Sequence, residues 1–208
     1  DREKLFSSIS HDLKTPITRL RLRVELLDDD TQIEKFSKDL DDLEMMVKGA
    51  LQTVKDTHIH ENIESIYINV FLAGMAQDYN LLEPHMTIEG HCKHLYRGKP
   101  LALKRCIANL IDNAIKYGDQ ARVIVMDDLE KNSKTNMLYI YVIDEGPGLP
   151  EHQLEKVFEP YYRLAQDSNG NGLGLGIARS IARAHGGDLV LENRPHGGLQ
   201  AILSLPRN

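Results

Sequence analysis

The run Leu138-Tyr139-Ile140-Tyr141-Val142-Ile143 leads directly into Asp144-Glu145-Gly146-Pro147-Gly148. Six consecutive apolar residues, rich in β-branched and aromatic side chains, favour a buried strand. The glycines permit a turn, so the sequence places a largely enclosed carboxylate, that of Asp144, at the end of the strand. Such a carboxylate can accept a hydrogen bond from an amino group of a ligand, and a simple turn cap is the alternative.

Around this strand the sequence alternates between short β-rich runs and amphipathic helices, which is the pattern of an α/β layer fold. We expect residues 63–208 to form one domain with a mixed sheet, preceded by a linker at residues 55–62. The expected strands are residues 65–68, 86–90, 94–98, 122–127, 138–143, 188–192 and 200–205. The expected helices are residues 70–81, 100–117 and 175–185.

Residues 1–58 follow a different pattern, in which apolar positions alternate by three and four. This spacing predicts two helices on either side of Asp28-Asp29-Asp30. An antiparallel helical hairpin is too small to bury both apolar stripes, so we expect a dimeric four-helix bundle. A hairpin packed on the rest of the same chain is the alternative. The stripes are Phe6, Ser10, Leu13, Ile17, Leu20, Val24 and Leu27, then Ile33, Phe36, Leu40, Leu43, Val47, Ala50 and Val54.

The helix expected at residues 100–117 carries three polar side chains at positions i, i+4 and i+7, namely Asn109, Asn113 and Lys116. Amide oxygens are suitable ligands for Mg²⁺, which keeps several waters and binds substrate phosphates as well. A lysine can meet a phosphate as a point charge. Taken alone, this spacing is more typical of a solvated helix face, so its meaning depends on the other motifs.

A second glycine-rich segment, Gly170-Asn171-Gly172-Leu173-Gly174-Leu175-Gly176, precedes the last expected helix. The N–H groups at such a helix start can hold phosphate oxygens. A Rossmann fingerprint needs a strand just before the glycines, but residues 163–169 form a polar loop, and no P-loop sequence occurs. Between the two glycine segments, residues 158–163 predict the aromatic foot of a mobile lid, or a plain surface loop.

Composition limits the partners and the compartment. The 208 residues carry a formal net charge of −6, which argues against nucleic acid as a partner. The two cysteines have no C-x-x-C spacing, which fits a reducing compartment. No apolar run is long enough to span a membrane and no signal peptide opens the chain. The sequence begins without Met in a charged, helical stretch, so we expect it to be cut from a larger protein.

The order of these segments resembles the sensor histidine kinases of two-component systems. The matching motifs begin with Ser10-His11-Asp12-Leu13-Lys14-Thr15-Pro16 and continue through the glycine segments over nearly the whole chain. The downstream matches are Asn109-x-x-x-Asn113-Ala114-x-Lys116-Tyr117, Asp144-x-Gly146-x-Gly148, Phe158-x-x-x-Tyr162-Arg163 and Gly170-x-Gly172-Leu173-Gly174-Leu175. Glu145 and Gly176 depart from the pattern, which often has Asn and then Ala or Ser. An added glycine near a helix start predicts local flexibility there.

The resemblance implies an α+β fold with a phosphoacceptor hairpin at residues 1–58 and a Bergerat-type α/β sandwich at residues 63–208. It implies that ATP binds under the lid, with Asp144 at the adenine amino group. The residues implied to surround ATP are Asn109, Asn113, Lys116, Tyr117, Asp144, Gly146, Gly148, Tyr162, Arg163, Gly170, Gly172, Leu173, Gly174 and Leu175.

The resemblance also assigns roles. Mg²⁺ is held by Asn113 with help from Asn109, and Arg163 or Lys116 approaches the phosphates. His11 is the phosphoacceptor, Asp12 its general base and Thr15 the residue that positions a water for phosphatase action. The implied partners are a second copy of the chain and the receiver domain of a response regulator. The implied location is the cytoplasmic part of a bacterial inner-membrane sensor whose membrane segments lie upstream of Asp1. An ATPase of the gyrase or chaperone kind, and a silent scaffold, are the alternatives.

Overall fold

We describe the chain in a computed structural model, which covers residues 15–27, 29, 32–33, 36–37, 40, 43, 61–128, 136–162 and 172–207. The chain divides into two compact units, of which one contains residues 1–59 and the other most of residues 60–208. His11, Asp12, Arg163 and Gly170 lie outside the described residues. Each unit is described by itself.

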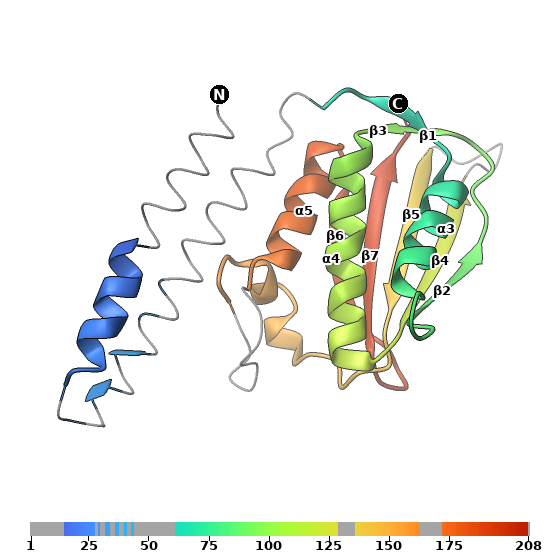
Figure 1. Cartoon of the computed structure of the whole chain (residues 1–208). Coiled ribbons are helices and arrows are strands. Elements are labelled where there is room, and N and C mark those ends of the chain that lie inside the picture. Colours follow the sequence, from blue (N-terminus) through green and yellow to red (C-terminus); the bar gives the residue numbers. More distant parts are fainter. Residues whose placement is uncertain are drawn as a thin grey trace. The chain divides into compact units, whose positions relative to one another are not determined.

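The larger unit is built on a five-stranded mixed sheet with the strand order β2-β4-β5-β7-β6 (Figure 1). Strands β2 and β4 are parallel, and the other neighbours are antiparallel. A small antiparallel ribbon, β1 with β3, lies outside this sheet. The strands are β1 (Glu64–Ile66), β2 (Met86–Gly90), β3 (Tyr96–Gly98), β4 (Ala121–Asp128), β5 (Met137–Ile143), β6 (Asp188–Asn193) and β7 (Leu199–Pro206). The predicted α+β class with a mixed sheet is therefore confirmed.

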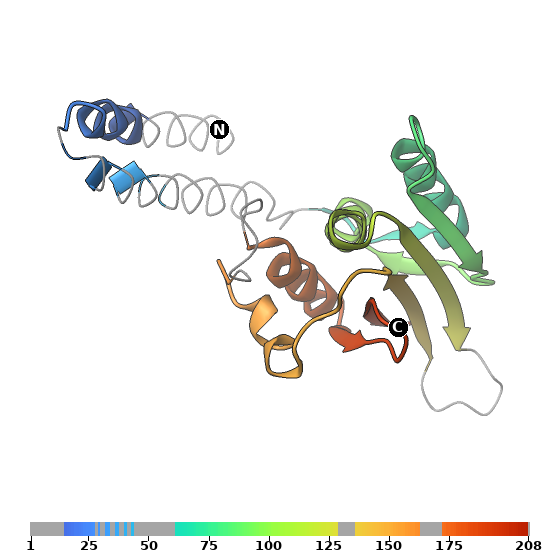
Figure 2. The same cartoon turned by 90° about the horizontal axis from the view of Figure 1, so that it is seen from below.

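Three helices cover one face of the sheet, as Figures 1 and 2 both show. They are α3 (Ile68–Tyr79), α4 (Pro100–Gly118) and α5 (Gly174–Ala184), and two short 3₁₀ turns, η1 (Glu151–Gln153) and η2 (Lys156–Phe158), come before α5. Side chains along β5 therefore alternate between buried and half-buried positions. In β5, Leu138, Ile140 and Val142 are buried beneath the helices, whereas Tyr139 and Tyr141 are half-buried. The core therefore lies between the helices and one sheet face.

Helix α3 begins and ends two residues earlier than the sequence predicts, and side-chain bonds to the backbone set the loop that follows it. Asn80 follows the helix, and its Oδ1 accepts the N–H groups of His85 and Met86 at 2.9 and 2.8 Å. Its Nδ2 donates to the carbonyl of Met86 at 2.8 Å. Asn80 thereby ends the helix and starts β2. Hydrophobic periodicity carries no signal for such a bond.

The N-terminus of α4 is capped by Glu61, a residue of the predicted linker. Its carboxylate accepts the N–H groups of Leu101 and Ala102 at 2.5 and 3.1 Å. The N-cap residue itself, Lys99, makes no capping bond with its side chain. A carboxylate in this position satisfies two free N–H groups and meets the positive end of the helix.

Replacing Glu61 by alanine is expected to lower the free energy of unfolding by about 1 kcal/mol, the usual effect of losing a helix cap. Urea unfolding followed by circular dichroism measures the change. Glu64→Ala is the control, because Glu64 is exposed on neighbouring β1. Equal losses in both variants would show that the cap does not stabilise α4.

In the N-terminal unit, residues 15–24 are helical, as are the described positions 32–33, 36–37, 40 and 43. Asp29 caps the second of these segments, since its carbonyl accepts the N–H of Ile33 at 2.9 Å and its Oδ1 that of Gln32 at 3.3 Å. Of the predicted stripes, Ile17 and Leu40 are buried. Leu20, Leu27, Phe36 and Leu43 are 40–47 % exposed. Within the described residues, none of the helices is long and apolar enough to cross a membrane.

Candidate functional site

Asp144 is a buried carboxylate held by the backbone at one of its two oxygens. It is 7 % exposed. Its Oδ1 accepts the N–H of Gly146 at 2.8 Å and the N–H of Leu199 at 3.1 Å. Both of these bonds end on Oδ1, so Oδ2 keeps its capacity to accept a hydrogen bond from a ligand. The predicted position of the carboxylate at the end of β5 is correct.

The loop that carries Asp144 packs directly against the C-terminal end of α4. A Cβ on Gly146 would lie 2.5 Å from the carbonyl oxygen of Tyr117. A Cβ on Gly118 would lie 2.8 Å from both the Cβ of Asp144 and the backbone nitrogen of Glu145. Only glycine permits this approach at both positions. The carboxylate is thus placed next to the last turns of the helix that carries the predicted metal ligands.

Asn109 lies one turn before the half-buried Asn113 on α4, beside the first residue of α5. A Cβ on Gly174 would lie 3.5 Å from the Oδ1 of Asn109. The Nδ2 of Asn109 is buried without a hydrogen-bond partner. Unpaired buried polar atoms are rare in folded proteins and often mark the place of a ligand or water. Two predicted site residues 65 positions apart are thereby brought together.

Lys116 and Tyr117 are exposed at the end of α4 and contact each other. The Nζ of Lys116 donates to the hydroxyl of Tyr117 at 3.0 Å and lies 4.7 Å from the centre of its ring. Both side chains lie at the surface, whereas the side chains of Asn109 and Asn113 are half-buried. An ammonium group on an exposed, flexible stem can move toward a phosphate without disturbing the core.

The described part of the second glycine segment makes close backbone contacts with the predicted foot of the lid, residues 158–163. Gly172 has a φ of 60°, and a Cβ there would lie 2.8 Å from the carbonyl oxygen of Tyr162. A Cβ on Gly176 would lie 2.8 Å from the carbonyl oxygen of Phe158. Glycine is therefore required at position 176 by close packing against Phe158, and the predicted local flexibility is not needed to explain it. Gly174 and Leu175 begin α5, and Leu173 is its N-cap residue.

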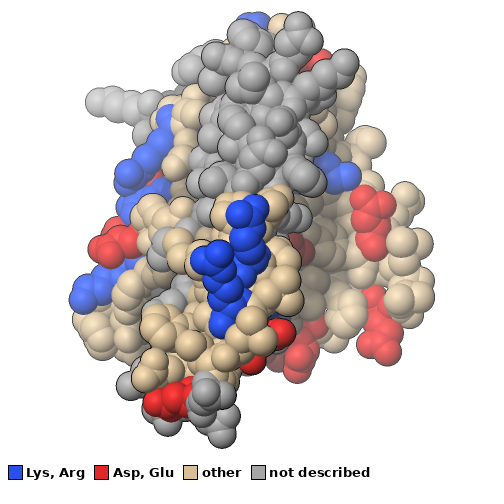
Figure 3. Space-filling view, turned by 60° about the vertical axis from the view of Figure 1, so that its left-hand side comes forward, with Lys and Arg blue, Asp and Glu red and all other residues tan. Residues whose placement is uncertain are grey.

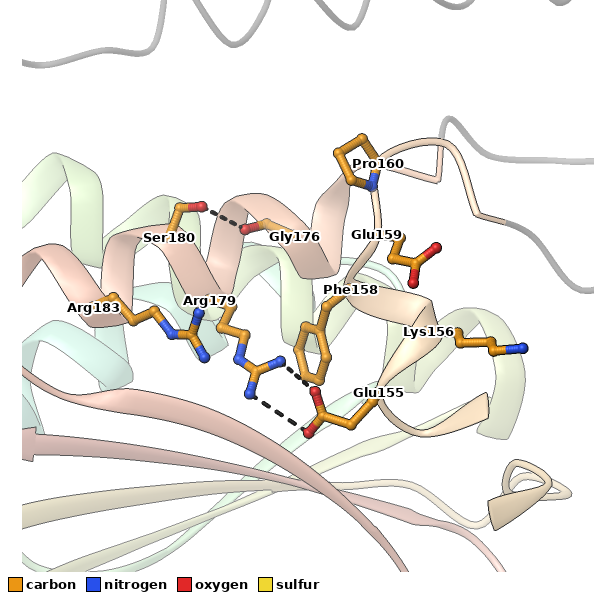
Figure 4. A pocket seen from close by; sticks show the side chains of 9 residues that line it. All are labelled: Glu155, Lys156, Phe158, Glu159, Pro160, Gly176, Arg179, Ser180 and Arg183. Atoms are coloured by element: carbon orange, nitrogen blue, oxygen red, sulfur yellow. Dashed lines mark hydrogen bonds and ion pairs between the residues drawn. The ribbon is translucent and has the colours of Figure 1, made fainter. Parts of the chain in front are cut away.

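A cavity of about 440 Å³ opens on another side of α5 (Figure 4). Its lining includes none of the predicted site residues. Arg179 crosses it: the guanidinium stacks on the Phe158 ring at 4.3 Å and bonds Glu155 at 2.7 Å. Arg179 and Arg183 both reach Asp188, at 3.1 and 3.0 Å. This network supports the buried Phe158, the predicted foot of the lid.

The charges around this network are closely balanced. Burial alone raises the pKa of Asp188, but the bonds from Arg183, the Leu189 N–H and Arg179 outweigh it and lower the pKa to about 2. Figure 3 shows both basic and acidic side chains on the face of the molecule that it draws. The cavity therefore carries an ion-pair network in which the charges of Arg179 and Arg183 are balanced by Glu155 and Asp188.

Two family models match the chain. Residues 98–208 match the histidine kinase-, DNA gyrase B- and HSP90-like ATPases, and residues 1–66 match the His Kinase A phospho-acceptor domain. The mixed sheet with helices on one face, the glycine loop at the end of α4 and the glycines at the start of α5 thus belong to the ATP-binding domain of this ATPase class. Together with the helical phospho-acceptor domain, this shows that the chain belongs to the sensor histidine kinases.

Known relatives agree with this family. The chain is 55 % identical over 207 residues to the sensor histidine kinase GtrS of Pseudomonas aeruginosa, covering 100 % of this chain and 42 % of the relative. It is 29 % identical over 221 residues to CpxA of Escherichia coli K12, covering 99 % and 47 %. The crystal structure of the ATP binding domain of PrrB from Mycobacterium tuberculosis aligns with a TM-score of 0.54 and 26 % identity, covering 71 % of this chain and 98 % of that one. The chain spans less than half the length of these two curated relatives.

Proposed function

We propose that the chain is the kinase core of a two-component sensor, which phosphorylates His11 with ATP and passes the phosphoryl group to an aspartate of a response regulator. The observation that carries the proposal is the buried carboxylate of Asp144, whose Oδ1 is fixed by two backbone donors and whose Oδ2 is left for a ligand. It lies beside the end of the helix that carries Asn109 and Asn113. Asp144, the proposed acceptor for the adenine amino group, therefore lies next to the helix whose asparagines are proposed to meet the phosphates and the metal.

The residues present suit ATP and Mg²⁺. The glycines at positions 118 and 146 leave no side chain between the Asp144 loop and α4. The buried, unpaired Nδ2 of Asn109 is a donor suited to a phosphate oxygen or to a metal-bound water. Asn113, with help from Asn109, would hold Mg²⁺, which supplies positive charge at the phosphates. Lys116 and Arg163 would meet phosphate oxygens, and the glycines near α5 would admit them to the backbone.

At the phosphoacceptor, one nitrogen of the His11 ring attacks the γ-phosphorus of ATP. A bond forms between nitrogen and phosphorus, the bond from phosphorus to the bridging oxygen breaks, and ADP leaves. An ordinary histidine, with a pKa of about 6.5, is mostly neutral at cytosolic pH and offers an unprotonated nitrogen. Asp12 orients the ring and takes its proton as the new bond forms. Thr15, which is exposed at the first described helical position, positions a water for removal of phosphate from the regulator.

The test of this function is incubation of the chain with γ-labelled ATP and Mg²⁺. Acid-labile label on the protein is the expected result, followed by its transfer to a receiver domain. Steady release of phosphate without labelled protein would instead support an ATPase that drives a conformational change, and ATP binding without turnover would support a scaffold.

Replacing Asn113 by alanine is expected to reduce the labelling rate by at least about a hundredfold, because even outer partners of metal ligands contribute up to that factor. The measurement is the initial rate of labelling at saturating Mg²⁺. Asp112→Asn is the matched control, because Asp112 is the preceding residue on α4 and accepts the hydroxyl of Tyr79 on α3 at 2.7 Å. Unchanged labelling in the Asn113 variant would remove it from the metal site.

We also propose that the hairpin forms a dimeric four-helix bundle. The predicted stripe residues Leu20 and Phe36 are 45 % and 46 % exposed, and exposed apolar stripes of two helices are typical of bundle partners. We place this core in the cytoplasm as part of an inner-membrane sensor.

The Leu20→Glu variant is expected to have half the mass of the natural chain in sedimentation, because each copy would bring a charge into the dimer core. Leu22→Glu is the control. Leu22 is 58 % exposed, more than Leu20, but lies outside the predicted stripe. If the two variants have the same mass as the natural chain, the stripe does not form the dimer contact.

A further inference from the structure

Between Asp144 and Leu149 the chain makes a tight loop that is held largely from outside. Within the loop, the Oδ1 of Asp144 accepts the N–H of Gly146. The other bonds described here come from the hairpin between β6 and β7, fifty positions along the chain. Besides its packing against α4, the loop that carries the predicted base contact is therefore held by side chains and backbone of this hairpin.

Asn193, the last residue of β6, forms two hydrogen bonds with Leu149 at the far end of the loop. Its Oδ1 accepts the N–H of Leu149 at 2.8 Å, and its Nδ2 donates to the carbonyl of Leu149 at 2.6 Å. A Cβ on Gly148, whose φ is 71°, would lie 2.7 Å from the same Oδ1. The side-chain amide thus pairs with both backbone groups of Leu149, as a neighbouring strand would, and packs closely against Gly148.

The near end of the loop is held by the same hairpin. The N–H of Asp144 donates to the carbonyl of Leu199 at 3.0 Å, and the N–H of Leu199 donates to the Oδ1 of Asp144 at 3.1 Å. The guanidinium of Arg194 donates to the carbonyl of Asp144 at 3.3 Å. The hairpin backbone thus fixes the Asp144 end of the loop, α4 packs against its middle at Gly146, and Asn193 holds its Leu149 end.

We infer that Asn193 is a positioning residue for base recognition: its two bonds to Leu149 hold the loop so that the Oδ2 of Asp144 meets the amino group of adenine. This inference rests on the proposed ATP binding. Asn193 does not touch the base. Its contribution is confined to the geometry of the acceptor, so it affects recognition of the amino group more than binding of the phosphates.

The fold contains a matched control for a bidentate asparagine. The Nδ2 of Asn69 donates to the carbonyl of Cys92 at 2.6 Å, and its Oδ1 accepts the N–H of Cys92 at 2.9 Å. These are the same two bonds that Asn193 makes with Leu149, at nearly the same lengths. Asn69 holds the loop between β2 and β3, which carries none of the predicted site residues.

The experiment compares the dissociation constants of ATP and of purine riboside triphosphate, which lacks the amino group, by titration calorimetry with Mg²⁺. Asn193→Ala is expected to reduce the preference for ATP about tenfold, with little effect on the analogue. Asn69→Ala should keep the natural preference even if it lowers the melting temperature equally. Asn193→Asp has the same shape and should also lose the preference, because a carboxylate oxygen would face the carbonyl of Leu149.

An unchanged preference in both Asn193 variants, or an equal loss in Asn69→Ala, would overturn the inference. Failure of the proposed function gives a different result. In that case the natural chain itself would bind ATP no more tightly than the analogue, and the role of Asp144 would fall together with that of Asn193.

Discussion

The His11→Gln variant is expected to take up no acid-labile phosphate from ATP, while binding ATP as tightly as the natural chain. Glutamine has nearly the size of histidine but offers no neutral ring nitrogen as nucleophile, so the chemical step is lost. The predicted nucleotide site lies among residues 109–175 and is not altered. The measurement pairs labelling by γ-labelled ATP with calorimetric binding of ATP.

Thr15→Ala is the control for this variant, since Thr15 follows His11 by one turn in the predicted helix. It should keep autophosphorylation and lose the ability to remove phosphate from a phosphorylated regulator. Acid-labile label on His11→Gln would assign the phosphoacceptor to another residue. Loss of autophosphorylation in Thr15→Ala, with phosphatase action kept, would contradict the division of roles between Asp12 and Thr15.

The Asp144→Asn variant is expected to bind ATP about ten- to a hundredfold more weakly, which corresponds to one hydrogen bond to a charged group. The amide oxygen can still accept the N–H groups of Gly146 and Leu199, so the loop keeps its bonds. The amide NH₂ then faces the amino group of adenine, donor against donor. The dissociation constant of ATP, measured by calorimetry, reports the loss.

Asp119→Asn is the matched control. Asp119 is exposed at the end of α4 with a φ of 62°, a conformation that asparagine also tolerates. Binding of purine riboside triphosphate should be nearly unchanged in Asp144→Asn, because the missing partner is specific to the amino group. An equal loss for both nucleotides would mean that the substitution disturbs the whole loop and that Asp144 does not recognise the base.

Local pattern was enough to predict most of the strands and helices and the mixed sheet, beginning from the run Leu138 to Ile143. The α+β class, which the family resemblance implied, is confirmed. The sequence also placed Asp144 correctly at a strand end, because a strand and its next turn are neighbours in the chain. The assignment of ligands to these side chains stays a prediction, with His11 and Asp12 outside the described residues.

The features that sequence reasoning missed depend on bonds between distant positions. Glu61 was assigned to a linker, yet it caps a helix forty positions away. Asn193 directly follows the expected strand 188–192 and was assigned no role, although its side chain bonds Leu149, 44 positions away. Gly176 suggested flexibility, whereas it admits the carbonyl of Phe158. A polar side chain that bonds a remote backbone has no periodicity, so a single sequence cannot reveal its partner.

The fixed Oδ1 of Asp144 has a consequence for the design of inhibitors. Because two backbone donors hold this carboxylate, its second oxygen is presented in one direction before any compound arrives. A heterocycle that offers an N–H donor there would meet an acceptor that is already oriented. Little of its binding free energy would then be lost in ordering the protein, so small aminated rings are reasonable starting fragments.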